Sequence, residues 1–387
     1  MPADLDLIIL GGGCAGLSLG LRLAENPGSC RRVMILESRK RYANDRTWCF
    51  WRLAPHRFDA LIRHQWSQVA VSSAHQSVVA DCGKTPYQML ASEDFYDQAC
   101  RLVHASDTVS LMLDTPFHGE AKRVGSYWQL DTARGPVTAN VVIDTRPPAT
   151  AVDDVLLWQS FSGQEIRCDA APFDTSTVQL MDFAAESHDE LRFTYLLPMS
   201  PERALVETTV FGTQPHNAAA LAARQLRAVE KYCGGALYEV HRTESGILPM
   251  GWRTRRAMSK GSFVSAGIMH GGARPASGYA FQRIQRWASD AARTLRGGDV
   301  PKPHQADPLP TRTMDRLLLK ALRARPDLGP QLFTDLFWHA DPARIIRFLS
   351  DKGTLADHLA MIGALPARPF LGAVFSGRTR ASASGAA

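Results

Sequence analysis

The spacing of apolar residues predicts that the chain opens with a strand, a helix and a second strand. Residues 5–10 form a short continuous apolar run, which is typical of a strand buried on both faces of a parallel sheet. A glycine-rich turn follows, and the apolar residues between positions 14 and 25 suit a helix that packs on that sheet. A second apolar run lies at residues 33–36. These segments predict a βαβ unit.

The next part of the chain predicts one helix and several strands. We expect the helix to begin near Ser92, whose hydroxyl group is a suitable N-cap. Strand-like runs follow at residues 109–113, 127–130 and 137–143, and the last of them ends at Asp144.

Three strand-like runs at residues 178–183, 191–197 and 203–211 change the character of the chain. A short turn with prolines joins the last two, so we expect an antiparallel sheet here. A helix over residues 218–232 follows.

A buried-strand pattern returns at residues 262–267, and a helix is expected over residues 281–295. We therefore expect the chain to re-enter its first domain. Prolines between residues 301 and 310 form a linker to a last region rich in helical apolar and basic residues.

The composition is that of a folded protein with a modest positive charge. Hydrophobic residues make up 45% and charged residues 21%, which argues against general disorder. A formal net charge of +6 suits an anionic cofactor or an anionic membrane surface. Nucleic acid binding is not indicated, because the chain has no long basic run and no zinc-finger spacing.

Cysteine usage and hydropathy bear on location. The seven cysteines are odd in number and contain no CxxC pair, which favours a reducing compartment and no metal site. No segment approaches the ~20 apolar residues of a membrane-spanning helix, and no signal peptide is expected. We therefore expect a cytoplasmic protein that touches the inner membrane only from its surface. The sequence predicts no oligomeric state.

The turn after the first strand carries a dinucleotide fingerprint. Residues 11–16 read G-G-G-C-A-G and match GxGxxG between a strand and a helix, where the mechanism needs it. Gly11 permits the tight turn, Gly13 lets the backbone approach a pyrophosphate, and Gly16 allows close helix packing. Glu37 ends the second strand, where it can bind ribose hydroxyl groups. The alternative is a glycine-rich turn that binds no ligand.

The order of segments favours FAD over NAD. The fingerprint opens the chain, an antiparallel sheet interrupts the nucleotide domain, and a glycine-containing strand returns late. Flavoproteins with this plan place the late segment, here residues 265–272, against the ribityl chain. This segment lacks the Gly-Asp pair that is usual in aromatic hydroxylases.

A series of short motifs runs in order over most of the chain. Residues 44–48 read N-D-R-T-W, residues 142–146 read V-I-D-T-R, and residues 159–165 read Q-S-F-S-G-Q-E. The others lie at residues 181–183, 193–200, 205–209, 244–249, 274–279 and 364–371.

In these motifs the chain resembles the FAD-dependent lycopene cyclases of bacteria and plants. Two stretches depart from the family pattern. Thr145 stands where the family often has glycine, and residues 269–275 differ from the L-H-P-T-T-G-Y of the best-known bacterial members.

The resemblance and the segment order together predict the fold. We expect an α/β protein with an α+β insertion, in the architecture of p-hydroxybenzoate-hydroxylase-like flavoproteins. The expected parts are a Rossmann-like FAD-binding domain at 1–160, an antiparallel-sheet substrate domain at 161–255, the return of the FAD-binding domain at 256–300, a helical C-terminal region at 305–375 and a disordered tail at 376–387.

The resemblance implies a lycopene β-cyclase-like isomerase. A proton adds to the terminal double bond of an acyclic carotenoid, an internal double bond attacks the cation, and loss of a proton leaves a β-ionone ring. Reduced FAD, formed with NAD(P)H, would stabilise cationic charge. The cofactor-binding residues that we expect are Gly11, Gly13, Cys14, Ala15, Gly16, Glu37, Arg46, Thr47, Trp48, Asp144, Gly267, Gly271, Gly272 and Gly278.

Protonation of an alkene needs a neutral carboxylic acid in a dry pocket. Glu207 fits, because strand alternation puts it on one face with Leu205 and Thr209 in an apolar run, and the resemblance makes the matching glutamate the acid-base residue. Its alternatives are exposure to solvent or pairing with an arginine such as Arg192. Asp182 is a second catalytic candidate, and its alternative is a carboxylate bonded to backbone amides.

Aromatic faces could hold the passing cation, although a hydrophobic core explains most aromatic residues. The candidates are Trp48, Trp51, Phe193 and Tyr195.

A lipophilic polyene such as lycopene resides in the bilayer. We therefore expect contact between the C-terminal helices and the membrane surface, with a plain helical cap as the alternative. The competing functions are a flavin monooxygenase or halogenase, a prenyl reductase, and a non-catalytic FAD-binding partner.

Overall fold

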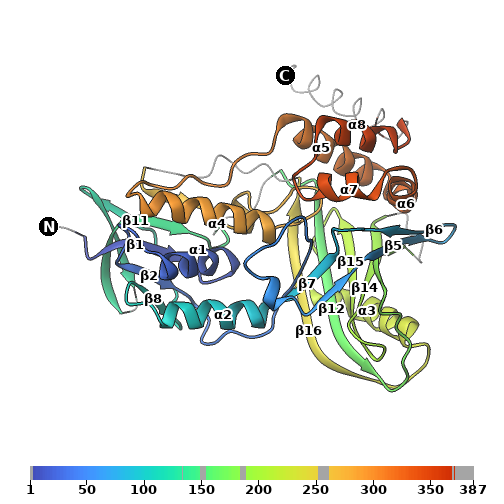
Figure 1. Cartoon of the computed structure of the whole chain (residues 1–387), viewed down its shortest axis with the longest axis horizontal. Coiled ribbons are helices and arrows are strands. Elements are labelled where there is room, and N and C mark those ends of the chain that lie inside the picture. The colour runs from blue at the N-terminus through green and yellow to red at the C-terminus, as the bar shows by residue number, and fades with distance from the viewer. Residues whose placement is uncertain are drawn as a thin grey trace, which may run out of the picture.

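The computed structural model describes residues 3–132, 134–148, 154–183, 189–251, 261–367 and 370. Two seven-stranded sheets and a three-stranded sheet form its framework. In Figure 1 the first sheet lies at the left with helices α1, α2 and α4, and the second sheet lies at the right below the C-terminal helices.

The first sheet has the strand order β8-β2-β1-β11-β10-β9, and β17 pairs with β11. Strands β10 and β9 are antiparallel to their neighbours, whereas the other pairings are parallel. The strands are β1 (Leu5–Leu10), β2 (Val33–Leu36), β8 (Val109–Met112), β9 (Lys122–Val124), β10 (Tyr127–Thr132), β11 (Gly135–Asp144) and β17 (Phe263–Ser265).

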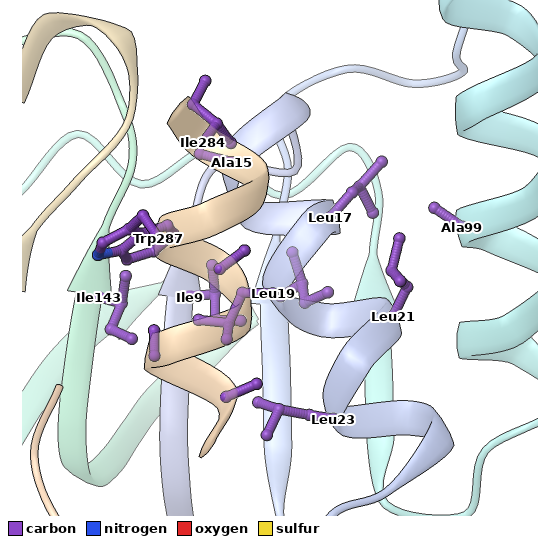
Figure 2. Close-up of a cluster of buried hydrophobic side chains, with 14 of the residues drawn as sticks. Ile9, Ala15, Leu17, Leu19, Leu21, Leu23, Ala99, Ile143, Ile284 and Trp287 are labelled. Carbon is purple, nitrogen blue, oxygen red and sulfur yellow. The ribbon is translucent and has the colours of Figure 1, made fainter. Parts of the chain in front are cut away.

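Three helices cover one face of this sheet. Leu7 and Ile9 of β1 belong to the core under the helices, while Ile8 and Leu10 belong to a separate core on the other face. Burial of both faces explains why the strand is apolar without interruption from Leu7 to Leu10. Figure 2 shows the apolar side chains of α1 between the sheet and its two helical neighbours. The helices are α1 (Cys14–Glu25), α2 (Ser92–His104) and α4 (Phe281–Arg296).

The second sheet has the order β16-β12-β15-β14-β13-β5-β6. Its pairings are antiparallel except for that between β13 and β5. Helix α3 (Ala218–Cys233) packs on one face of it, through Val229 among others. The strands are β5 (Gln68–Ser73), β6 (Ser77–Asp81), β12 (Leu157–Cys168), β13 (Thr177–Phe183), β14 (Leu191–Pro198), β15 (Arg203–Gly212) and β16 (Tyr238–Met250).

The remaining elements connect and cover these sheets. Helix α6 (Gly329–His339) contacts β5 and β6. None of the helices in the described ranges is long and apolar enough to cross a bilayer. The small sheet consists of β3 (Thr47–Trp51), β4 (His64–Trp66) and β7 (Tyr87–Ala91). The C-terminal helices are α5 (Leu309–Ala324), α6 (Gly329–His339), α7 (Pro342–Leu349) and α8 (Leu355–Gly363), and 3-10 turns lie at Asp59–Leu61, Ile268–His270 and Pro326–Leu328.

Three expectations differ from, or fall outside, what the structure describes. Strand β12 runs across the boundary that we placed after residue 160, because it pairs along its length with β15 and β16. Helix α2 begins at Ser92, but the predicted N-cap role of Ser92 is wrong: Ala91 holds the cap position, and the Ser92 hydroxyl accepts the backbone N–H of Arg46 at 3.0 Å. The expected disordered tail lies outside the described residues.

Candidate functional site

The glycine turn after β1 has the geometry of a pyrophosphate site. Gly11 has a φ of +92°, and a Cβ at Gly16 would lie 1.9 Å from the carbonyl oxygen of Gly11. A Cβ at Gly13 would meet no atom within 4 Å, so the backbone there faces open space. Helix α1 begins directly afterwards at Cys14, and its N-terminal amides favour an anion in that space. The turn therefore fits the diphosphate of a dinucleotide.

Glu37 is positioned for the ribose of such a ligand. Its carboxylate accepts the backbone N–H groups of Gly12 at 2.7 Å and Arg39 at 2.8 Å. Burial alone would raise the pKa of Glu37, but the hydrogen bonds from Arg39 and Gly12 lower it. An ionised acceptor therefore lies beside the fingerprint, where a ribose hydroxyl group could donate to it.

The late glycine segment lies at the same edge of the first sheet. Asp144 pairs in register with Leu10 of β1 and Ser265 of β17, so the ends of these parallel strands are adjacent. Gly267 follows β17 with a φ of +96°. The same edge carries Gly271 and Gly272, and the backbone N–H of Gly272 bonds to the Gly267 carbonyl at 2.9 Å.

His304 contacts the late glycine segment through a hydrogen bond. Its Nε2 accepts the Gly267 N–H at 3.1 Å, and its ring lies 5.1 Å from that of Trp287. Burial lowers the pKa of His304 to about 3, and a neutral imidazole can accept this bond. The Asp144 carboxylate is bound by Arg146 at 2.7 Å.

Three further predicted cofactor residues, Thr47, Trp48 and Gly278, contact the first core or the second sheet. Trp48 stacks on Phe281 at 5.2 Å, within the core under α2 and α4. The Thr47 hydroxyl instead bonds to Glu244 of the second sheet. Gly278, with a φ of +71°, faces that sheet too, since a Cβ there would lie 2.8 Å from the Gln159 side-chain oxygen.

A cavity of about 980 Å³ lies between the late glycine segment, the end of β16 and helix α5. Gly278 lines it together with Leu248, Pro275 and His270. The cavity is large enough for a cofactor ring or an apolar chain.

Glu207 is a half-buried carboxyl group on β15. Loss of hydration and, after it, the neighbouring Glu244 raise the pKa of Glu207 to about 8, while the hydroxyl of Thr209 opposes the rise. This hydroxyl donates to the carboxyl group at 3.1 Å. Arg192, the alternative partner, forms an ion pair with Glu190 instead. A neutral carboxyl group at neutral pH fits the acid that the sequence predicts.

Glu207 and Glu244 meet across a glycine. Both pair with Gly163 of β12, one from β15 and one from β16. Directly opposed residues point to the same face of an antiparallel sheet. A Cβ at Gly163 would lie 3.2 Å from Cγ of Glu244 and 3.4 Å from Cβ of Glu207. The missing side chain lets the two carboxyl groups approach each other over the strand, close enough for Glu244 to raise the pKa of Glu207.

Glu244 is held by an arginine and a threonine. Arg242 donates to its Oε2 at 2.5 Å, and the Thr47 hydroxyl donates to the same oxygen at 2.9 Å. Arg242 also binds Glu165 at 3.2 Å. The sequence analysis assigned no role to Glu244 or Arg242. Glu244 opens one of the quoted motifs, but only the register opposite Gly163 shows that it meets Glu207.

Aromatic side chains surround the acid. Tyr195 pairs with Glu207 in register, and its ring lies 5.2 Å from that of Phe193. The Trp51 ring lies 5.6 Å from that of Tyr279, which is close enough to Tyr195 to influence its ionisation. Burial raises the pKa of Tyr195 well above its usual value, so its phenol stays neutral. Of the four aromatic candidates, Trp51, Phe193 and Tyr195 lie on this side, whereas Trp48 does not.

The second catalytic candidate faces away from this group. Asp182 pairs with Thr194, and Thr194 pairs with Thr208, which is adjacent to Glu207 and therefore points to the opposite face. There Asp182 accepts a hydrogen bond from the Tyr232 hydroxyl at 2.5 Å and forms an ion pair with Lys231 of α3. The structure does not bring Asp182 and Glu207 together.

The chain is similar to known carotenoid enzymes. A family model described as lycopene cyclase protein matches residues 6–374. A lycopene beta-cyclase of Pantoea ananas is 25% identical over 398 residues, which cover 97% of this chain and 98% of that protein. A lycopene beta-cyclase of Paracoccus is 26% identical over 258 residues, covering 60% of this chain and 63% of that protein.

Solved structures share the fold at low sequence identity. A geranylgeranyl bacteriochlorophyll reductase-like protein of Thermoplasma acidophilum has a TM-score of 0.60 and 13% identity, covering 96% of this chain and 98% of that one. A p-nitrophenol 4-monooxygenase of Pseudomonas putida has a TM-score of 0.59 and 15% identity, with 96% and 99% covered. A flavin-dependent brominase has a TM-score of 0.60 and 15% identity, with 97% and 99% covered. The predicted fold class is confirmed.

Proposed function

Since the chain belongs to the lycopene cyclase family, we propose that it closes the ψ-end groups of lycopene, or of a related acyclic polyene, to β-ionone rings. The observation that carries this proposal is the neutral carboxyl group of Glu207 on an aromatic-lined face of the second sheet. The reaction is an isomerisation, because atoms are rearranged and no electrons are gained or lost.

Glu207 supplies and recovers the proton. Its O–H bond breaks as a new C–H bond forms at the terminal alkene of the polyene. The cation is then attacked by an internal double bond, and the carboxylate of Glu207 takes a proton from the ring carbon next to the new cation. The faces of Tyr195 and Trp51 are suited to hold the positive charge in the meantime.

FAD is the cofactor that the first domain fits. The turn at Gly11, Gly13 and Gly16 would hold its diphosphate, Glu37 its ribose, and the segment from Gly267 to Gly272 its ribityl chain. When bound and reduced, with NAD(P)H as the electron source, FAD supplies an electron-rich ring that stabilises nearby positive charge.

The test supplies lycopene in liposomes with anaerobically reduced FAD. A cyclic product of unchanged mass is expected from the natural sequence. Glu207→Gln should retain FAD and lose ring formation by about a hundredfold or more. Glu190→Gln is the matched control, because Glu190 directly precedes β14, is ion-paired with Arg192, and should leave cyclisation normal.

Other outcomes would replace the proposal. A product heavier by two hydrogens indicates a prenyl reductase, and NAD(P)H-linked oxygen consumption with an oxygenated product indicates a monooxygenase. Flavin retention with no turnover of any polyene indicates a binding protein.

The membrane contact is proposed at helix α8. Leu355, Leu359 and Ile362 are 73%, 60% and 56% exposed and recur at helical spacing. Trp338, at the end of α6, is 61% exposed. Such an apolar row suits insertion into the headgroup region of a bilayer, from which a polyene must be drawn.

A further inference from the structure

The side chains of Glu207 and Glu244 lie on the same face, on either side of Gly163. Two ionised carboxylates have only acceptor oxygens and cannot hydrogen-bond to each other, so carboxyl groups this close favour protonation of one member. Two like charges this close also disfavour double ionisation. The arrangement across Gly163 therefore holds at least one proton.

The surroundings of the pair are asymmetric. Arg242 and Thr47 both donate to one oxygen of Glu244, and an arginine stays charged in a protein. Among the described residues, the donor to the carboxyl group of Glu207 outside the pair is the neutral hydroxyl of Thr209. The negative charge is thus stabilised on Glu244, whose side chain is only 3% exposed.

We propose that Glu244 is a positioning residue: as a carboxylate held by Arg242 and Thr47, it keeps the shared proton on Glu207. This inference rests on the proposed function and names how its acid is maintained. When Glu207 gives its proton to the alkene, two carboxylates face each other, and their repulsion favours return of the proton from the cyclised cation. The cycle needs no other proton donor, because the proton that is spent is regained.

The other groups around Glu207 do not supply a second charge. Burial raises the pKa of each titratable neighbour on the adjoining strands and the loop before α4. These neighbours are Cys49 on β3, Tyr87 on β7, Tyr195 on β14 and Tyr279. Within the described residues, Glu244 and Arg242 are the charged groups that act on Glu207, and Glu165 of β12 shares Arg242 with Glu244.

The test follows the carbonyl stretch of the protonated carboxyl group by infrared difference spectroscopy on the purified full chain without substrate. Glu207→Gln should abolish this band. Glu244→Gln removes the neighbouring negative charge, so the band of Glu207 should be lost at a pH lower by about one unit or more. Glu244→Asp keeps the charge and should stay close to the natural sequence. Glu190→Gln, the matched control, should leave the band unchanged.

Arg242 gives a second route to the same test. Arg242→Gln leaves Glu244 without its cation, so a second protonated carboxyl band should appear, and Arg242→Lys should suppress it. This variant also decides the matter if Glu244→Gln does not fold. A Glu207 band whose titration is unmoved in Glu244→Gln, or the absence of a second band in Arg242→Gln, overturns the proposal.

Turnover separates this inference from the proposed function. Protonated Glu207 is the active form, so cyclisation should fall as the pH rises, and Glu244→Gln should move this fall to lower pH. If the natural sequence cyclises no polyene, the proposed function fails, while the infrared titration still tests the carboxyl pair.

Discussion

At the scale of single residues, the face of a strand decides what a carboxyl group can do. Asp182 and Glu207 occupy strands of the same sheet, but they point to opposite faces. Asp182 meets Lys231, which compensates its charge. Glu207 loses hydration without a cation bonded to it in the described part of the chain, so its proton is retained. Residue type alone does not separate the two roles.

Two glycines of the fingerprint allow a sharper test of the cofactor site. Gly16→Ala puts a methyl group 1.9 Å from the Gly11 carbonyl oxygen, so we expect a loss of about 1–3 kcal/mol of stability without any ligand. Gly13→Ala meets no protein atom within 4 Å, and its backbone is extended. It should leave the melting temperature of the ligand-free protein unchanged and weaken FAD binding about tenfold, or about 1.4 kcal/mol.

Thermal unfolding and FAD titration by flavin fluorescence measure these two effects separately. Equal FAD affinity in Gly13→Ala and the natural sequence would show that the open space at this turn does not hold the cofactor.

The proposed acid could be identified from the sequence, whereas its neighbour Glu244 could not. Period-2 alternation places Glu207 in an apolar strand, and this is a local property. Glu244 lies 37 positions later in the chain than Glu207 by residue number, and it meets that residue only because both strands pair with Gly163. Pairing register between distant strands is set by the whole sheet, so no local pattern reveals it.

At the scale of elements, local periodicity predicted the first βαβ unit and the strands β8, β10, β11, β13, β14, β15 and β17, but not the long strands β12 and β16. The first domain that we predicted, at 1–160, includes residues 68–81, but there β5 and β6 join the second sheet, where β5 pairs with β13. Val69 and Val71 of β5 enter the core shared with the C-terminal helices. Apolar residues in a short strand fix that the strand is buried, but not which sheet buries it.

Helix α8 gives the element-scale prediction. Leu359→Glu on its exposed face should lower binding to phosphatidylglycerol-containing vesicles by about tenfold, since full burial of a leucine contributes about 1.5–3 kcal/mol. Leu226→Glu on α3 is the matched control, because Leu226 is 48% exposed and α3 lies near the bottom of Figure 1, far from α8 at the top. Vesicle flotation measures both variants. Equal binding by the two variants would exclude α8 as the membrane contact.

At the scale of the whole molecule, a buried ion pair joins the loop between β17 and α4 to the C-terminal helices. Arg274, in the loop between β17 and α4, binds Asp315 of α5 at 2.9 Å, and their side chains are 1% and 4% exposed. The guanidinium group also lies 4.2 Å from the ring of Phe348 on α7. The helical region is thus joined to the loop that lines the cavity, so a change that destabilises one should also destabilise the other.

Replacing Arg274 and replacing Asp315 should lower the free energy of unfolding by different amounts. Burial raises the pKa of Asp315, and Arg274 opposes this rise. Arg274→Met therefore leaves a carboxyl group that can take up a proton, and its cost should shrink at low pH. Asp315→Leu leaves a guanidinium group that cannot lose its proton, so it should cost about 3–5 kcal/mol of unfolding free energy. The double variant should recover most of this loss, because no unpaired charge remains buried.

Urea unfolding at two pH values measures these changes. Asp290→Asn, which breaks an ion pair of 69% and 70% exposed side chains, is the control and should change stability by at most about 1 kcal/mol. If Asp315→Leu costs no more than this control, the buried pair does not join the two parts of the molecule. If Arg274→Met and Asp315→Leu lower the free energy of unfolding equally at every pH, then the carboxyl group of Asp315 does not take up a proton in Arg274→Met, and the predicted difference is wrong.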